Sequence, residues 1–279
     1  MMIISVASGK GGTGKTTVST NLAMSIGTDV QLLDCDVEEP NLHLFLTPEK
    51  GETDTINTLV PEILEARCSY CGECEALCQF KAIAIIAGTA AMTFPELCHS
   101  CGGCFKVCPE NAIQNSYREL GTITRGTYQN IELVYGRLRV GEAMAPPLIK
   151  KVKSYAPLDR INIVDSPPGT SCPVIAAISD TDFVILVTEP TPFGLNDLTL
   201  AVGAVQMLDI PFGLVINRSD IGNRDVKDYA ASIGMPVLME IPFDRQIAEA
   251  TTNGKLMVKE LPGYQEKFLD ILEQINQIV

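Results

Sequence analysis

The sequence contains no tryptophan, only two histidines and few aromatic residues, and it has no long apolar run. A membrane-spanning helix needs about 18 apolar residues in a row, and no stretch of the chain reaches that length. No basic leader with a cleavage site precedes the first apolar segment, so we expect a cytoplasmic protein. Basic residues are also scarce, because 21 lysines and arginines stand against 34 acidic residues, a net charge of −13. This charge repels nucleic acid, which we do not expect as a partner.

Cysteine is the residue type that the chain has in excess. Its 279 residues, 46% of them hydrophobic, can bury one large core or two smaller ones. Ten cysteines in a protein expected in a reducing compartment favour metal ligands or redox chemistry over structural disulfides. Eight of them lie between residues 68 and 108, which indicates a separate module within the chain.

A glycine-rich loop near the N-terminus predicts a nucleotide site. The apolar run at residues 3–7 predicts a buried strand, residues 18–26 have helical spacing, and Gly9 to Thr16 between them matches G-x-x-x-x-G-K-[ST]. Backbone N–H groups of such a loop, together with the helix N-terminus, surround phosphate. Lys15 is expected to reach the β- and γ-phosphates, and the Thr16 hydroxyl to ligate Mg²⁺. The expected nucleotide-binding residues here are Gly11, Gly12, Thr13, Gly14, Lys15, Thr16 and Thr17.

The residues from Lys10 to Thr17 resemble the deviant Walker A motif of the MinD/ParA family. This SIMIBI-type group of P-loop ATPases is related to the Mrp-type ATPases and the nitrogenase iron protein. The resemblance implies ATP or ADP as the nucleotide and a homodimer that forms with ATP. It also implies that Lys10 reaches across the dimer interface to the partner's nucleotide. A solvated loop lysine is the alternative interpretation of Lys10.

Two acidic motifs follow apolar strands and resemble further motifs of that family. In Asp34-Cys35-Asp36, the resemblance implies that Asp36 positions or activates the attacking water, while a turn or capping aspartate is the alternative. Asp165 begins a D-x-P-P-G motif, which implies that Asp165 holds Mg²⁺ through water and that the Gly169 N–H senses the γ-phosphate. The expected catalytic residues are Lys10, Lys15, Asp36 and Asp165.

Three further apolar strands, at residues 183–187, 212–217 and 237–241, extend the alternation of strands and helices. By resemblance to the family, Asn217 and Arg218 occupy the position that recognises adenine, and Pro242 belongs to the loop that closes over the base. A plain turn residue is the alternative for Asn217.

The eight clustered cysteines form two copies of the pattern C-x₂-C-x₂-C-x₃-C, thirty residues apart. This spacing resembles that of bacterial ferredoxins with two [4Fe–4S] clusters, in which the fourth cysteine of each run ligates the other cluster. Zinc sites more often pair two separated C-x₂-C knuckles, so zinc is the weaker alternative. The resemblance assigns cluster I to Cys68, Cys71, Cys74 and Cys108, and cluster II to Cys98, Cys101, Cys104 and Cys78.

Two cysteines remain outside these runs. We expect Cys35 and Cys172 to be packed thiols, with a role in the dimer interface or in redox chemistry as the alternative for Cys172. We expect His99, inside the second cysteine run, to be a solvated loop residue. The C-terminal segment, residues 264–279, predicts a helix with an acidic polar face and an apolar stripe at Phe268, Leu272, Ile275 and Val279. The acidic face favours packing on the sheet over docking to an anionic membrane.

The predicted fold is α/β: a doubly wound, mainly parallel P-loop domain with an inserted α+β ferredoxin domain of bacterial type. The expected boundaries are 1–51 for the first part of the ATPase domain, 52–145 for the insert and 146–279 for the second part. Within the insert, the cysteine module covers about 65–115, and a β extension over 117–142 joins it to the ATPase domain.

The first functional hypothesis is a Mg²⁺-dependent ATPase in which the nucleotide state of a homodimer gates two [4Fe–4S] clusters for electron transfer to a redox partner. The alternative from another class is an ATPase that assembles or carries iron–sulfur or other metal cofactors. A positioning ATPase that acts on a membrane or on DNA is the third hypothesis, and the acidic charge of the chain argues against it.

Overall fold

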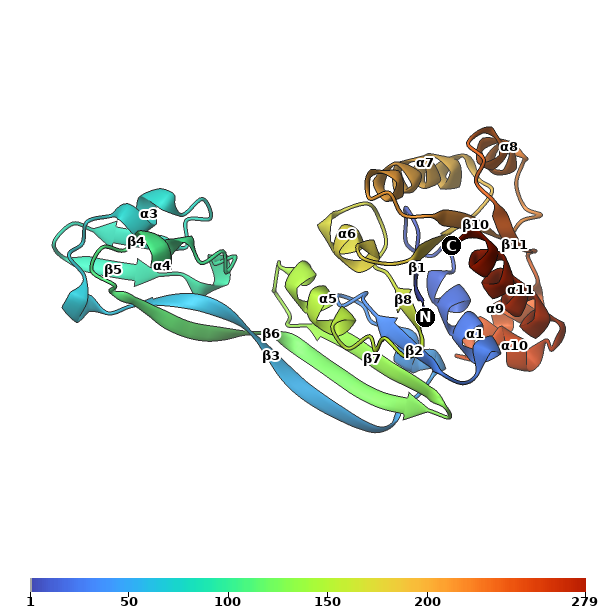
Figure 1. Ribbon diagram of the computed structural model, residues 1–279, viewed down its shortest axis with the longest axis horizontal. Helices are drawn as coiled ribbons and strands as arrows, with labels where there is room; N and C mark the ends of the chain where they lie inside the picture. Colours follow the sequence, from blue (N-terminus) through green and yellow to red (C-terminus); the bar gives the residue numbers. More distant parts are fainter. Residues whose placement is uncertain (1) are drawn as a thin grey trace. The chain divides into compact units, whose positions relative to one another are not determined.

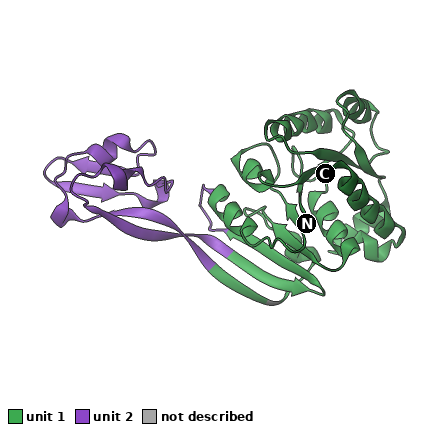
Figure 2. Ribbon diagram, in the orientation of Figure 1, with its two compact units in different colours: residues 1–54, 123–137, 145–279 green, residues 55–122, 138–144 purple. Residues whose placement is uncertain are grey.

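The structure, a computed structural model, describes residues 2–279 and divides the chain into two compact units (Figures 1 and 2). The first unit holds the residues up to Asp54 together with residues 123–137 and 145–279. The second unit holds residues 55–122 and 138–144. Two long strands, β3 (Glu49–Ile63) and β6 (Ile113–Tyr128), contribute residues to both units.

A nine-stranded sheet with the order β11-β10-β9-β1-β8-β2-β7-β6-β3 organises the fold. The pairs from β11 through to β7 are all parallel, which confirms the mainly parallel α/β sheet expected from the sequence. Its strands besides β3 and β6 are β1 (Ile3–Ala7), β2 (Val30–Asp34), β7 (Ile131–Leu138), β8 (Ile161–Asp165), β9 (Phe183–Thr188), β10 (Phe212–Asn217) and β11 (Val237–Ile241).

Both faces of the central strands of this sheet are buried. In β9, Phe183 and Ile185 pack into one hydrophobic cluster, whereas Val184 and Leu186 pack into another. Successive side chains of a strand point to opposite faces, so a strand between two helical layers must be apolar throughout. This is why the central strands read as continuous apolar runs in the sequence.

Helices cover the two faces (Figure 1). Those whose buried residues join the Phe183 cluster are α1 (Lys15–Ile26), α2 (Leu42–Phe45), α9 (Arg245–Thr252), α10 (Met257–Glu260) and α11 (Gly263–Ile278). Those whose buried residues join the Val184 cluster are α6 (Cys172–Ile178), α7 (Pro192–Met207) and α8 (Asp225–Ser232). A further helix, α5 (Ala145–Lys153), packs against α6.

The second unit contains the same local structure twice. Each cysteine run begins after a 3₁₀ turn, at Glu65–Arg67 or Pro95–Leu97, and continues into a short helix, α3 (Glu73–Leu77) or α4 (Gly103–Val107). An antiparallel hairpin of β4 (Ile83–Ile86) and β5 (Ala90–Thr93) lies between the two copies in the chain. Left-handed backbone recurs at equivalent positions, thirty residues apart, in the pairs Tyr70 and Ser100, Gly72 and Gly102, and Lys81 and Asn111.

The region expected to form a β extension is divided differently from that expectation. Strand β7 pairs in parallel with β2, with Gln31 opposite Glu132 and Asp34 opposite Tyr135, so it belongs to the main sheet. Residues 123–137 accordingly fall in the first unit and only residues 138–144 rejoin the second. The alternating pattern predicted strands here, but it contains no information on which strand they pair with.

The C-terminal helix α11 packs against α1 and β11, and its apolar stripe differs slightly from the predicted one. Phe268, Ile271 and Ile275 are fully buried, whereas Val279, placed on the stripe from the sequence, is 59% exposed. Across residues 2–279, no helix combines the length and the apolar character needed to cross a bilayer.

We expect Phe268→Ala to destabilise the first unit by about 3–5 kcal/mol, because it leaves a cavity under a fully buried ring. Urea unfolding followed by circular dichroism measures this loss. Val279→Ala, at the exposed end of the same helix, serves as the matched control and should change stability by less than about 0.5 kcal/mol. Equal losses in the two variants would contradict the packing of α11.

Candidate functional site

The predicted phosphate-binding loop joins β1 to α1, and its shape depends on glycine. Gly12 and Gly14 have φ values of 78° and 101°, in the left-handed region that favours glycine. Gly9 has no room for a side chain, because a Cβ there would lie 2.2 Å from the carbonyl oxygen of Asp197 in α7. Helix α1 begins directly after this loop, at Lys15. The loop therefore has the arrangement that directs backbone N–H groups towards an anion.

Lys15 is buried at the start of α1, surrounded by the carboxyl groups that end two strands. Burial lowers the pKa of Lys15 below its ordinary value, while Asp165, Asp36 and Asp34 act in the opposite direction. Burial also raises the pKa of Asp36 to about 6, against the effect of Lys15. The pKa values of Asp34 and Asp165 are raised as well, chiefly by complete burial. The site thus concentrates negative charge around one lysine.

Asp165 is held by two hydroxyls of α1. Its Oδ2 accepts a hydrogen bond from Thr16 Oγ1 at 2.7 Å, and its Oδ1 accepts one from Ser19 Oγ at 2.9 Å. The parallel pairing of β2 with β8 places Asp34 directly beside Asp165. Thr16 and Asp165, the two residues expected to hold Mg²⁺ directly and through water, are therefore in contact.

The carboxylate of Asp34 fixes the loop that contains Asp36. Asp34 Oδ1 accepts from the Asp36 N–H at 3.0 Å, and Oδ2 accepts from the N–H groups of Asn41 and Leu42 at 2.9 Å and 3.1 Å. This turn leaves Asp36 partly buried next to Lys15, since each group shifts the pKa of the other. Asp34 is thus the residue that shapes the loop, and Asp36 is the one placed near the lysine.

A pocket adjoining the phosphate loop contains the residues expected to bind the base. Asn217 Nδ2 donates to the carbonyl oxygen of Thr13 at 2.9 Å, and it would lie only 2.6 Å from a Cβ placed on Gly14. The lining residues come from the P-loop, the ends of β10 and β11, and α9: Gly12, Gly14, Thr17, Asn217, Arg218, Ile241, Pro242, Phe243, Asp244, Ile247, Ala248, Thr251 and Thr252. The structure therefore brings Asn217, Arg218 and Pro242 together.

Two groups expected to act on nucleotide have other partners within the chain. The Gly169 N–H, expected to sense the γ-phosphate, donates to the carbonyl oxygen of Ser8 at 3.0 Å. Lys10 Nζ lies 3.6 Å from Glu189 Oε2. Sensing by Gly169 therefore requires that its present hydrogen bond breaks.

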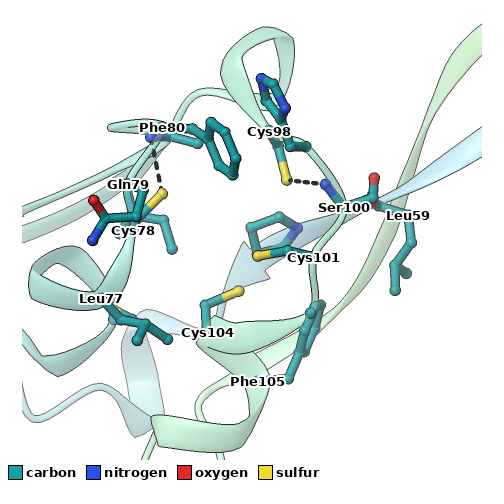
Figure 3. A pocket seen from close by; sticks show the side chains of 16 residues that line it. Leu59, Leu77, Cys78, Gln79, Phe80, Cys98, Ser100, Cys101, Cys104 and Phe105 are labelled. Atoms are coloured by element: carbon teal, nitrogen blue, oxygen red, sulfur yellow. Dashed lines mark hydrogen bonds between the residues drawn. The ribbon is translucent and has the colours of Figure 1, made fainter. Parts of the chain in front are cut away.

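In the second unit, the thiols assigned to cluster II line one cavity (Figure 3). Figure 3 shows the sulfur atoms of Cys78, Cys98, Cys101 and Cys104 directed towards the same space. Cys74 also borders this cavity, whose remaining lining is largely apolar. The crossing of Cys78 to the second run, inferred from the ferredoxin spacing, is thus compatible with the geometry.

A second cavity is lined by the four thiols assigned to cluster I, Cys68, Cys71, Cys74 and Cys108. Each half of the unit therefore contributes three cysteines to one cavity and a fourth to the other. As the side chains stand, no three of the Cys, His, Asp and Glu residues within 2–279 form a group able to hold a single metal ion. In a [4Fe–4S] cluster each thiolate binds a different iron, so its ligands lie further apart than those of one ion.

Backbone N–H groups point at the sulfur atoms in the same way in both halves. Tyr70 N donates to Cys68 Sγ and Ser100 N to Cys98 Sγ, both at 3.4 Å. After the short helices, Ala82 N donates to Cys78 Sγ at 3.3 Å and Ala112 N to Cys108 Sγ at 3.2 Å. N–H groups that face sulfur stabilise thiolate, which is the ligand form of cysteine. The residues present therefore fit a pair of clusters.

The remaining cysteine and histidine predictions are confirmed only in part. Cys35 is fully buried, in agreement with a packed thiol. Cys172 is exposed at the start of α6, so the prediction of a packed thiol was wrong there, and the interface or redox alternative stays a prediction. A strand-to-helix junction rich in proline does not reveal which side faces solvent. His99 is exposed as expected, but it also lines the cavity of the second cysteine run, where its ring stacks on that of Phe80 with centroids 3.6 Å apart.

Sequence reasoning missed three side chains of these sites. Ser19 could have been found from its position one turn after Lys15, and Glu189 from its place after an apolar strand, as for Asp165. Nothing in the sequence around Arg118 indicates that it contacts a cysteine run. It is buried in an ion pair with Glu142 and donates to the carbonyl oxygens of Pro95 and Cys98 at 2.7 Å and 3.3 Å.

The chain is similar to known proteins over nearly its whole length. An uncharacterized protein of Methanocaldococcus jannaschii, MJ0579, is 34% identical over 282 residues, which cover 96% of each chain. The iron-sulfur cluster carrier protein of the same organism is 25% identical, over 99% of this chain and 84% of the relative.

Solved structures show the same fold. The septum site-determining protein MinD of Pyrococcus horikoshii, in complex with Mg-ADP, matches with a TM-score of 0.61 and 24% identity, over 99% of this chain and 96% of that one. In addition, residues 4–257 match the model of the CobQ/CobB/MinD/ParA nucleotide binding domain. With most of its length matched in this way, the chain belongs to the CobQ/CobB/MinD/ParA family of nucleotide-binding proteins.

Proposed function

We propose that the protein is an ATPase in which the nucleotide state of a homodimer gates two [4Fe–4S] clusters for electron transfer to a partner. One observation carries the proposal: a single chain combines the phosphate-binding loop with two cavities, each lined by the four cysteines of one expected cluster. Family membership supports the nucleotide part, and the ferredoxin spacing supports the clusters.

In the nucleotide site, Lys15 and the N–H groups of the loop neutralise the phosphates, and the Thr16 hydroxyl ligates Mg²⁺ with Asp165 acting through water. Asp36 positions the attacking water. Asn217, Arg218 and Pro242 hold the base in the pocket that they line. Lys10 leaves Glu189 and reaches the nucleotide of the second copy, where it stabilises negative charge in trans.

In the second unit, Cys68, Cys71, Cys74 and Cys108 hold cluster I, and Cys98, Cys101, Cys104 and Cys78 hold cluster II. Clusters of this type supply one-electron transfer at low potential. Coupling runs along the chain itself, because the Asp36 loop ends at Leu42 and β3 begins only seven residues later, at Glu49. A nucleotide that moves this loop therefore acts on the strand that enters the second unit.

A second candidate is a metallocluster carrier that transfers its clusters to acceptor proteins. The specific observation in its favour is the similarity to proteins named iron-sulfur cluster carrier protein, at 25% identity over 99% of this chain. A protein partner that accepts either electrons or clusters is part of both candidates.

Lys15→Ala is expected to lower ATP hydrolysis about 100-fold or more, because it removes the buried cation of the loop. Lys10→Ala should retain ATP binding by the monomer while losing both ATP-dependent dimerisation and hydrolysis. Phosphate release and light scattering with ATP measure these quantities. Lys227→Ala, which removes only an exposed ion pair with Glu240, is the control and should behave as wild type. Full activity of Lys10→Ala would refute the trans role.

The crossed assignment of cysteines predicts the iron content of double variants. Cys78→Ser with Cys98→Ser alters one cluster only, so iron should fall from about eight to about four atoms per chain. Cys78→Ser with Cys68→Ser alters both clusters and should leave almost none. An uncrossed arrangement gives the reverse pattern. Cys172→Ser should keep all eight, since this thiol lies in neither cavity.

The two candidate functions predict different effects of ATP on protein that contains its iron–sulfur clusters. If nucleotide gates the clusters, Mg-ATP should change the rate of iron chelation by bathophenanthroline disulfonate several-fold in wild type and leave it unchanged in Lys15→Ala. A carrier should instead lose iron to an apo-ferredoxin when ATP is present, which iron analysis of the separated proteins measures. An ATP-independent chelation rate together with retained iron speaks against both candidates.

A further inference from the structure

Glu189 directly follows β9 and lies beside the phosphate-binding loop, and the mechanism described so far gives it no role of its own besides its contact with Lys10. It is a carboxylate residue that is only 8% exposed. Its Oε2 lies 3.6 Å from Lys10 Nζ, and its Oε1 lies 3.0 Å from Arg218 Nη1. The contact with Arg218 lacks hydrogen-bond geometry, so Oε1 is a buried acceptor satisfied only by charge. One nearly buried carboxylate is therefore shared by the loop lysine and by the arginine of the base pocket.

The backbone that carries Glu189 is fixed by close packing. Thr191 N donates to the Glu189 carbonyl oxygen at 2.8 Å, and a Cβ on Gly194 would lie 2.1 Å from that same oxygen. A Cβ on Gly222 would lie 1.5 Å from the carbonyl oxygen of Pro190. Glycine at 194 and 222 thus allows two segments to approach the Glu189 turn more closely than any other residue permits.

The two cations, by contrast, are held loosely. Lys10 sits in the phosphate loop with a third of its side chain exposed, and Arg218 has 48% of its side chain exposed. Both have long side chains that can reach other anions. When a bond to Glu189 breaks, the cation can therefore move away while the carboxylate stays where it is.

We propose that Glu189 is a positioning residue that retains Lys10 within its own chain and so competes with the partner's nucleotide for this lysine. The inference rests on the proposed trans role of Lys10. A nearly buried carboxylate that loses a cation is left with poorly compensated charge, which opposes the departure of Lys10. Arg218 remains beside Glu189 as the second cation, so the free-energy cost of losing Lys10 is moderate. Glu189 thereby raises the protein concentration at which ATP drives dimerisation.

Glu189→Gln keeps the size of the side chain and removes its charge. With the nonhydrolysable analogue AMP-PNP, we expect the monomer–dimer dissociation constant from analytical ultracentrifugation to fall about two- to fivefold, the range of a partly exposed ion pair. The protein concentration at half-maximal ATP turnover should fall by a similar factor, more than maximal turnover changes. High salt should reduce the difference from wild type, since salt screens charge.

The double variant Lys10→Ala with Glu189→Gln separates this inference from the proposed function. If Glu189 acts through Lys10, the Gln substitution has no effect on dimerisation once Lys10 is absent. Glu240→Gln, which removes a partly exposed carboxylate of the same unit, is the matched control and should not alter dimerisation. Glu189→Asp, which withdraws the carboxylate by one methylene, should change dimerisation in the same direction as Gln and tests the inference if the Gln variant is unstable.

The outcomes are distinguishable. Unchanged or weaker dimerisation of a folded Glu189→Gln, with Lys10→Ala still defective, overturns the inference and leaves the proposed function intact. Normal dimerisation of Lys10→Ala overturns the trans role of the lysine itself. A Glu189→Gln effect that persists without Lys10 shows that the carboxylate acts through another group, which also overturns the inference.

Discussion

The structure depends on the placement of one buried lysine among three carboxyl groups at the carboxyl edge of the sheet. Lys15 alone cannot balance Asp34, Asp36 and Asp165, and burial pushes all three acids towards the neutral form. Mg²⁺ bound here would relieve this conflict, because a divalent cation favours the ionised carboxylates, and a phosphate group would then be attracted to the remaining positive potential of the loop. Since Asp34 also fixes the loop from Asp36 to Leu42, any change in charge at this edge acts on that loop directly.

The features of the fold and of the nucleotide site that depend on a few neighbouring residues could be predicted from the sequence. The glycine loop, the apolar runs of the central strands and the acids that end them follow from steric and burial requirements within a few residues. The partners of Lys10 and of β7 could not be predicted, because Glu189 lies far away in the chain and the neighbour of β7 depends on sheet order. The exposure of Cys172 and the burial of Ile271 likewise depend on which elements pack nearby.

The two cysteine runs are more similar in backbone conformation than in the side chains that contact them. Left-handed residues and N–H donors to sulfur recur at intervals of thirty residues, but Arg118 acts on the second cysteine run alone. The residue thirty positions earlier is Gly88, which has no side chain with which to hold the first run. The guanidinium fixes two carbonyl oxygens at the start of the second run, whereas its charge is largely compensated by Glu142. The second run therefore has a side-chain support that the first run lacks, with little change in net charge.

The core of the second unit helps to decide whether the proposed clusters stay bound or are transferred to an acceptor protein. Its buried apolar side chains are few, chiefly Val60, Ala82, Ile83, Ala112 and Leu120. A unit of this size buries too little apolar surface to be very stable alone, and small domains of this kind gain stability from bound metal. Because each four-thiol cavity takes residues from both halves, loss of a cluster would also separate those halves. Release of the proposed clusters would then be coupled to local unfolding, which supports the proposed electron transfer over the alternative of a cluster carrier.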